Sequence, residues 1–187
     1  MRRTLLVALL AMAVTSGCIG TAAKQAYYGA TGASARYYEV KSLGGQNSLD
    51  AFAAVGVQPF DTSPMLGAVP VSVVGEVQTC IVEKLLETKM FQSVTKGAPA
   101  GQGLVIRGKF VDFDSGGSAL RAVGFGVDPF LTAQIELVDT GSNKVVGVAM
   151  VTGTVKSAVR TGLQELADGV GKAVKGLVER HHTKPPK

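Results

Sequence analysis

The chain has 187 residues, a formal net charge of +5 and 18% charged residues, whereas soluble proteins average about 25%. Its 24 glycines are nearly twice the usual share of about 7%. This composition excludes a metal-cluster protein, a multidomain enzyme and a polytopic membrane protein, and it lacks the concentrated basic face typical of nucleic-acid binding.

Residues 1–17 are typical of a cleaved export signal. Arg2 and Arg3 precede an apolar run from Leu5 to Val14, and a run of that length is too short to span a bilayer as a helix, which takes about 20 residues. Small polar residues then lead to Cys18. We therefore expect the mature chain to begin there.

The residues Ser16, Gly17 and Cys18 resemble the bacterial lipobox, in which the cysteine becomes acylated and N-terminal. Thr15 departs from that pattern, because an aliphatic residue is commoner at its position. The alternative is ordinary signal cleavage near Ala23, which would discard Cys18. Lipidation of Cys18 is the favoured interpretation, and two or three acyl chains hold a protein durably on a membrane, since each buried methylene contributes about 0.8 kcal/mol.

The residue after Cys18 is Ile19 rather than aspartate. By resemblance to Gram-negative lipoproteins, this implies sorting to the inner leaflet of the outer membrane, with the body facing the periplasm. Residues 18–48 have no sustained hydrophobic period, so we expect a lipidated N-terminus and flexible tether there. The tether contains two tyrosine pairs, Tyr27-Tyr28 and Tyr37-Tyr38, which could dock on the domain, lie at the membrane interface or contact a partner.

The folded domain is expected over residues 49–180, beginning with a strand from Ala53 to Phe60. A helix should follow Pro70, because apolar residues recur at spacings of three and four through Leu85. The helical pattern includes Cys80, whose thiol we expect to be buried and inert. A short strand is predicted from Phe91 to Thr95.

In the second half three longer strands are predicted. The second of them alternates clearly between apolar and polar residues, and the last two form a hairpin. A second helix shows three glycines at seven-residue intervals, and these favour close packing of that helix over a marginal helix. A basic tail, residues 181–187, is predicted to be disordered. The strands are Leu104–Phe113, Phe130–Val138 and Val145–Val155, the helix is Ser157–Arg180, and the glycines are Gly162, Gly169 and Gly176. Together these elements predict an α+β fold, with a mainly antiparallel sheet of about five strands and two helices packed on one face.

Groups that could carry catalysis are few. His181 and His182 lie together in the predicted tail without a third metal ligand, so we expect no metal and no cofactor. Carboxylates near strand ends are more typical of turns than of an acid–base pair. These carboxylates are Asp112, Asp114, Asp128 and Asp139.

One loop carries a more specific pattern. It contains a Gly-Ser-x-x-x-Arg stretch followed by Gly-Phe-Gly, and its candidate ligand or partner residues are Gly117, Ser118, Arg121, Gly124, Gly126 and Asp128. Arg121 could bind a carboxylate or phosphate, or it could pair internally with Asp112, Asp114 or Asp128.

With the strand into Pro59-Phe60 and the segment Val138 to Gly141, this loop resembles a family of bacterial lipoproteins catalogued as domain of unknown function 4410. The likeness spans about Leu49 to Val178. It implies a mixed α/β envelope domain without an established enzymatic activity. This chain departs from the family pattern at Val127 to Phe130.

We therefore expect a lipid-anchored, non-enzymatic binding or assembly module of the cell envelope, bound to the membrane and to an envelope protein but not to nucleic acid. One alternative is a small-ligand carrier with an apolar pocket between helices and sheet. The other is a hydrolase that would use Asp112, Asp114 or Asp128 with Arg121, and it predicts a concave pocket holding at least two of these carboxylates.

Overall fold

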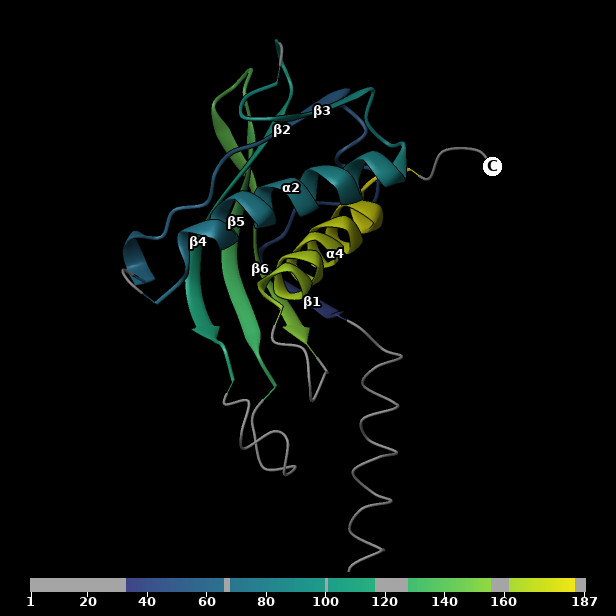
Figure 1. Ribbon diagram of the computed structural model, residues 1–187. Helices are drawn as coiled ribbons and strands as arrows, with labels where there is room; N and C mark the ends of the chain where they lie inside the picture. Colours follow the sequence, from purple (N-terminus) through teal and green to yellow (C-terminus); the bar gives the residue numbers. More distant parts are fainter. Residues whose placement is uncertain (1–32, 66–67, 100, 117–127, 156–161, 184–187) are drawn as a thin grey trace, which may run out of the picture.

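A six-stranded sheet carries two helices on one of its faces (Figure 1). The structure is a computed structural model, and it describes residues 33–65, 68–99, 101–116, 128–155 and 162–183. The strands are β1 (Ala33–Lys41), β2 (Ala54–Val57), β3 (Ser93–Lys96), β4 (Leu104–Asp114), β5 (Phe130–Asp139) and β6 (Lys144–Val155). The helices are α2 (Val71–Thr88) and α4 (Leu163–His181), and a 3-10 turn, η1, spans Ser63–Met65.

The strand order is β1-β6-β5-β4-β2-β3. Pairings β1–β6, β6–β5 and β5–β4 are antiparallel, whereas β2 pairs in parallel with both β4 and β3. The predicted α+β class with two helices is confirmed. The sheet, however, has six strands and is mixed, because helix α2 returns the chain between β2 and β3 and so makes their pairing parallel.

The sixth strand lies in the segment that the sequence predicted to be a tether. Strand β1 pairs with β6 along its whole length, from Ala33 opposite Val155 to Lys41 opposite Val148. The prediction of a flexible segment up to residue 48 is therefore wrong from residue 33 onward. From Ala33 to Tyr37 small or apolar residues alternate with polar ones, but the adjacent Tyr38 breaks this alternation, and Glu39 then occupies a position on the helix side of the sheet. The pattern is therefore too short to predict a nine-residue strand.

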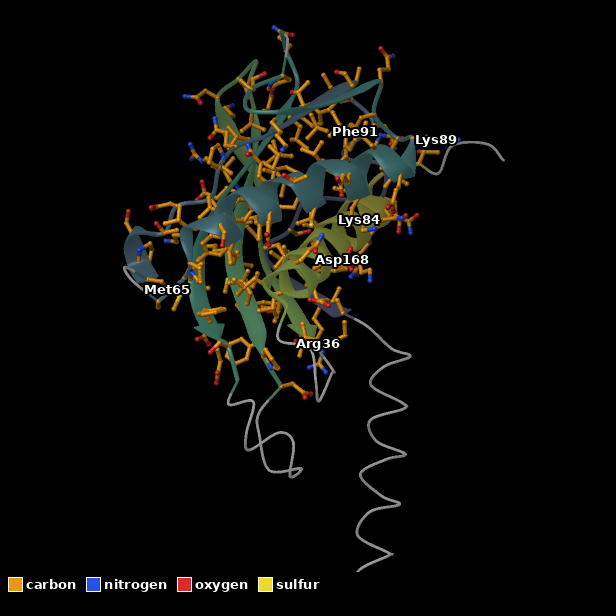
Figure 2. The ribbon with its side chains drawn as sticks, in the orientation of Figure 1. Arg36, Met65, Lys84, Lys89, Phe91 and Asp168 are labelled. Atoms are coloured by element: carbon orange, nitrogen blue, oxygen red, sulfur yellow. The ribbon has the colours of Figure 1, made fainter. Side chains whose placement is uncertain are left out.

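The core lies between the sheet and the helices. Along β5, Leu131, Ala133, Ile135 and Leu137 are fully buried and alternate with partly exposed polar residues, as the sequence predicted. Helix α2 contributes a buried row that includes Val77, Ile81 and Leu85. The helices contact each other, and Figure 2 shows Lys84 and Asp168 at that contact, where Nζ and Oδ1 lie 3.5 Å apart.

Helix α4 packs closely on the sheet through a pair of glycines. A Cβ atom added to Gly153 on β6 would lie 2.3 Å from the carbonyl oxygen of Leu166, and one added to Gly169 would lie 2.7 Å from the Cα atom of Gly153. The close packing predicted from the glycine spacing is thus confirmed at Gly169. Gly162 instead occupies the N-cap of α4, which begins at Leu163 rather than Ser157. Residues 156–161 lie outside the described part.

The end of α4 is held in place where the sequence predicted a disordered tail. His181 is the last helical residue and is 5% exposed, and its carbonyl oxygen accepts a hydrogen bond from the N–H of Leu49. The N–H of Thr183 donates to Asp50 Oδ1 at 2.7 Å. The prediction of disorder is therefore wrong for residues 181–183, because these contacts fix them to the segment after β1. Residues 184–187 lie outside the described part.

Candidate interaction surface

Most of the predicted site residues lie outside the part of the chain that the structure describes. This holds for Cys18 and for the loop residues Gly117, Ser118, Arg121, Gly124 and Gly126. Asp128 is described, two residues before the start of β5 at Phe130, and it is partly buried. The neighbouring Pro129 accepts a hydrogen bond from the N–H of Val155 through its carbonyl oxygen, which joins this end of β5 to β6.

The carboxylates near strand ends that are described in detail stabilise turns. Asp114 Oδ1 accepts the N–H of Gly116 at 2.6 Å. Asp139 accepts the N–H of Gly141 at 2.8 Å and the hydroxyl of Ser142 at 2.6 Å. The hydrogen bond from Ser142, with those from the backbone, lowers the pKa of Asp139 below its usual range. These contacts fit the turn interpretation of the two residues.

The face of the sheet opposite α2 and α4, here called the outer face, carries partly exposed side chains from four neighbouring strands. At its β1 end, Tyr38 lies opposite Met150, and Arg36 lies opposite Thr152. Further along, Thr132 and Thr152 share a hydrogen bond of 3.0 Å between their hydroxyl oxygens. The outer face thus carries an aromatic ring and an arginine at β1, whereas charged residues such as Arg107 and Lys109 lie on it at β4.

The tyrosine pair on β1 is divided between the two faces of the sheet. Tyr37 faces the helices and packs against the core, where its ring lies next to Gly176. Tyr38 points the other way and is 67% exposed, and Val40 is 56% exposed. This edge strand therefore carries two of the large apolar side chains that are exposed on the described surface. An adjacent tyrosine pair is the signal that could have indicated a strand with one buried and one exposed ring.

A polar groove of about 290 Å³ lies at the other end of the outer face. Arg107 on β4 and Glu136 on β5 form an ion pair across the strands, with Nη2 and Oε2 2.8 Å apart. Both residues line the groove, and its other lining residues are Gln58, Pro59, Asp61, Gly108, Lys109 and Gln134. Asp61 accepts hydrogen bonds from the N–H and the hydroxyl of Ser63, and these lower its pKa.

A second hollow, of about 380 Å³, lies along α2 and is lined largely by polar side chains, among them Glu76, Glu83 and Lys96. Cys80 also lines it and is partly exposed, rather than fully buried as predicted. Burial raises the pKa of the Cys80 thiol, and the carboxylates of Asp168, Glu83 and Glu76 raise it further. At a given pH a smaller fraction of this thiol is therefore ionised than of an ordinary cysteine, which makes it a weaker nucleophile.

Neither hollow has the character that the two alternative functions require. Asp112, Asp114 and Asp128 line neither of them, and the residues that line both are mostly polar or charged, whereas a ligand carrier has a pocket lined by apolar side chains. Within the described ranges, no group of three or more His, Cys, Asp and Glu side chains is placed to bind a metal ion. Of the helices in the described part, none is both long and apolar enough to cross a membrane.

The model of a family described as a domain of unknown function, DUF4410, matches residues 30–158. The chain belongs to the DUF4410 family. The match begins just before β1 and ends before α4, so it starts earlier and stops earlier than the span from Leu49 to Val178 on which the resemblance rested. Strand β1 is thus part of the DUF4410 domain. None of the curated protein sequences is significantly similar to the chain.

Two solved structures of PelC from Paraburkholderia phytofirmans share the fold. A single-residue variant of the PelC dodecamer matches with a TM-score of 0.52 and 16% identity, over 76% of this chain and 96% of PelC. Another PelC dodecamer matches with a TM-score of 0.50 and 16% identity, over 78% of this chain and 96% of PelC. The likeness covers nearly all of PelC, and it shows that the DUF4410 chain shares an architecture with a protein that forms a dodecamer.

Proposed function

We propose that this DUF4410 protein is a lipid-anchored, non-enzymatic module of the bacterial cell envelope that binds protein subunits and assembles with them. Acylation of Cys18 anchors it to the inner leaflet of the outer membrane, and the domain faces the periplasm. The outer face of the sheet and its edge strand β1 bind the protein subunits, and the protein catalyses no reaction.

The observation that carries the binding role is the exposure of Tyr38 and Val40 on an edge strand of the sheet. Tyrosine is enriched at protein interfaces because its ring is apolar and its hydroxyl is polar. Natural proteins usually protect such an edge, because its unpaired N–H and C=O groups invite a further strand. The shared fold of the PelC dodecamers supports a role in an assembly of subunits.

The support for the anchor comes from the sequence. An apolar run of signal-peptide length leads into Ser16, Gly17 and Cys18, which match the small residues and the cysteine of a lipobox. Between Cys18 and the start of β1 at Ala33 lie 14 residues. A chain of that length spans up to about 45 Å when extended, so the domain can stand clear of the lipid headgroups.

The anchor is tested by mass spectrometry and membrane fractionation of the full chain expressed in a Gram-negative host. We expect the mature N-terminus at Cys18 with a diacylglyceryl group and a further acyl chain. Cys18→Ser should abolish both the acyl mass and membrane retention, whereas the matched control Cys80→Ser should keep both. Recovery of an unmodified chain that is released from the membrane would contradict the proposal.

The binding role is tested separately by the native mass of the acylated chain in detergent and after chemical cross-linking in intact cells. We expect species larger than the single chain. A chain that stays a monomer and cross-links to no protein at its native membrane concentration contradicts a role in assembly.

A further inference from the structure

The two edges of the sheet differ in how open they are to another strand. Strand β3 at one edge has only four residues and ends at Lys96, whose Nζ donates a hydrogen bond to the hydroxyl of Thr79 at 2.7 Å. Gly97 then turns the chain with a φ of +89°. Strand β1 at the other edge has nine residues, and within the described part of the chain no strand pairs with its free side.

The side chains of β1 on the outer face are suited to contact with a further strand. Arg36 is exposed, Tyr38 is 67% exposed, and the two are neighbours on the same face of the strand (Figure 2 labels Arg36). At the far end, a β-bulge between Glu39 and Lys41 ends the regular pairing. The side chain of Lys41 contacts β6, where its Nζ donates a hydrogen bond to the carbonyl oxygen of Val145 at 2.6 Å. The open part of the edge is thus centred near Tyr37.

We infer that β1 is a self-association strand, which pairs antiparallel with β1 of a second copy about a two-fold axis at Tyr37. This inference rests on the proposed function and names one partner, a second copy of this chain. In an antiparallel pair, residues that lie directly opposite share a face of the sheet. With the axis at Tyr37, Arg36 of each copy therefore lies opposite Tyr38 of the other, on the outer face.

Charge selects this register over its neighbours. An axis at Arg36 would place the two guanidinium groups directly opposite each other, and like charges in that position destabilise a strand pair. An axis at Tyr38 would run the pairing into the bulge after Glu39. With the axis at Tyr37, each guanidinium instead meets an aromatic ring, and arginine over tyrosine is a favourable cation–π pair. The sequence of β1 is thus complementary to itself in one register.

Pairing across this axis joins two sheets into one continuous sheet and covers the exposed ring of Tyr38 on both copies. The interface is isologous, so it closes as a two-fold pair and leaves β3 free. A larger assembly would then use other surfaces to join such pairs.

The register is tested by disulfide cross-linking in the full, acylated chain with Cys80→Ser as background. Chains carrying Arg36→Cys and chains carrying Tyr38→Cys are given different tags and expressed together. We expect the mixed disulfide to form at several times the yield of either homodimer, because positions 36 and 38 are directly opposite while identical positions lie on a diagonal. A parallel mixture of Ser93→Cys and Tyr38→Cys chains tests pairing between β1 and β3. The inference is overturned if the mixed disulfide and the homodimers form in equal yield, or if no disulfide forms. It is also overturned if Tyr38→Cys chains cross-link only to Ser93→Cys chains.

A second measurement uses light scattering of the full chain in detergent. Tyr38→Lys puts a cation opposite Arg36 of the second copy, so we expect at least a halving of the native protein mass. The matched control is Val71→Lys, at an 87%-exposed position on α2, and it should leave the mass unchanged. An unchanged mass for Tyr38→Lys, or an equal loss for both variants, overturns the inference. If Tyr38→Lys fails to fold, the cross-linking yields decide.

These outcomes separate the inference from the proposed function. An acylated chain that forms larger species without β1 cross-links overturns only the self-association strand. Cross-links at β1 in a chain that lacks an acyl group support the strand pairing and contradict the anchor.

Discussion

Nε2 of His181 lies 2.9 Å from Oε1 of Glu39, although 142 residues separate them in the sequence. The contact joins the end of helix α4 to edge strand β1, and both side chains are largely buried. Because the carboxylate can only accept, the imidazole nitrogen donates the hydrogen bond. The N–H of Leu43 donates to the other oxygen of the same carboxylate at 3.3 Å. Glu39 therefore connects three segments at one corner of the domain.

The first prediction concerns the stability of the domain at low pH. The hydrogen bond from His181 lowers the pKa of Glu39 below 4.5, and the Leu43 N–H and the positive charges of His181 and Arg180 act in the same direction, against burial. A carboxylate with a lowered pKa in the folded state stabilises that state above the unfolded-state pKa, and this contribution is lost as the pH falls through the folded-state pKa. We expect Glu39→Gln to reduce the free energy of unfolding at pH 7 by about 1–2 kcal/mol and to flatten its decline below pH 4.5. Urea denaturation over a pH series measures this, with Glu179→Gln as the control, and equal pH profiles for wild type and Glu39→Gln would contradict it.

The second prediction concerns the glycine contact between α4 and β6. Gly169→Ala should destabilise the domain by about 3 kcal/mol or more, because the added Cβ meets backbone atoms of Gly153 and Ser34 that cannot move aside as a side chain can. Gly75→Ala on α2 is the matched control, since its Cβ would have nothing within 4 Å. That change should stabilise the helix by up to about 1 kcal/mol. Chemical denaturation of both variants decides, and a loss of stability at Gly75 equal to that at Gly169 counts against the packing argument.

The third prediction concerns the Cys80 thiol. Since its pKa is raised, we expect it to react with iodoacetamide at pH 8 several-fold more slowly in the folded chain than in the chain unfolded by urea. The Cys18→Ser variant makes Cys80 the single thiol, so the labelled mass reports it alone. Equal rates in the folded and unfolded chains would show that burial does not protect the thiol.

The fourth prediction concerns the ion pair in the polar groove. The side chains of Arg107 and Glu136 are 51% and 33% exposed, so solvent screens much of their attraction. A double-mutant cycle with Arg107→Ala and Glu136→Ala should give a coupling energy below about 1 kcal/mol, and that energy should fall further in 1 M salt. A coupling energy of several kcal/mol would contradict this prediction. It would show that solvent screens the pair poorly, and the groove would then be the first place to test for a charged ligand.

The sequence predicts an element well where its side chains alternate or repeat in hydrophobicity. Strand β5 follows this rule, because Leu131 and Ile135 face the core while Gln134 faces out. The rule is weaker at β1, where Tyr38 interrupts the alternation and Glu39 occupies a position on the helix side, so the strand is defined by its pairing with β6 and by the contact with His181. Such long-range partners leave no local pattern.

The same limit applies to the candidate site. The predictions of an anchor at Cys18 and of a partner-binding glycine-rich loop rest on local motifs, and both segments lie outside the described residues. The exposed ring of Tyr38 was part of a pair for which the sequence left three roles open. Only the register with β6 shows that Tyr37 packs inward on the core while Tyr38 faces outward. Exposure at an edge is a property of the assembled sheet, and no spacing rule encodes it.

The antiparallel partnership of β1 with β6 also bears on the order in which the domain is built. Strand β1 is synthesised first among the described strands, but it pairs only with β6, which is synthesised last. The middle of the sheet can therefore form before β1 is paired. Contacts between such distant segments slow folding, because a long loop must close before they form. Until β6 has been synthesised, β1 and the β6-facing side of β5 have no partner within the described sheet, and partly folded chains are most vulnerable to aggregation in that interval.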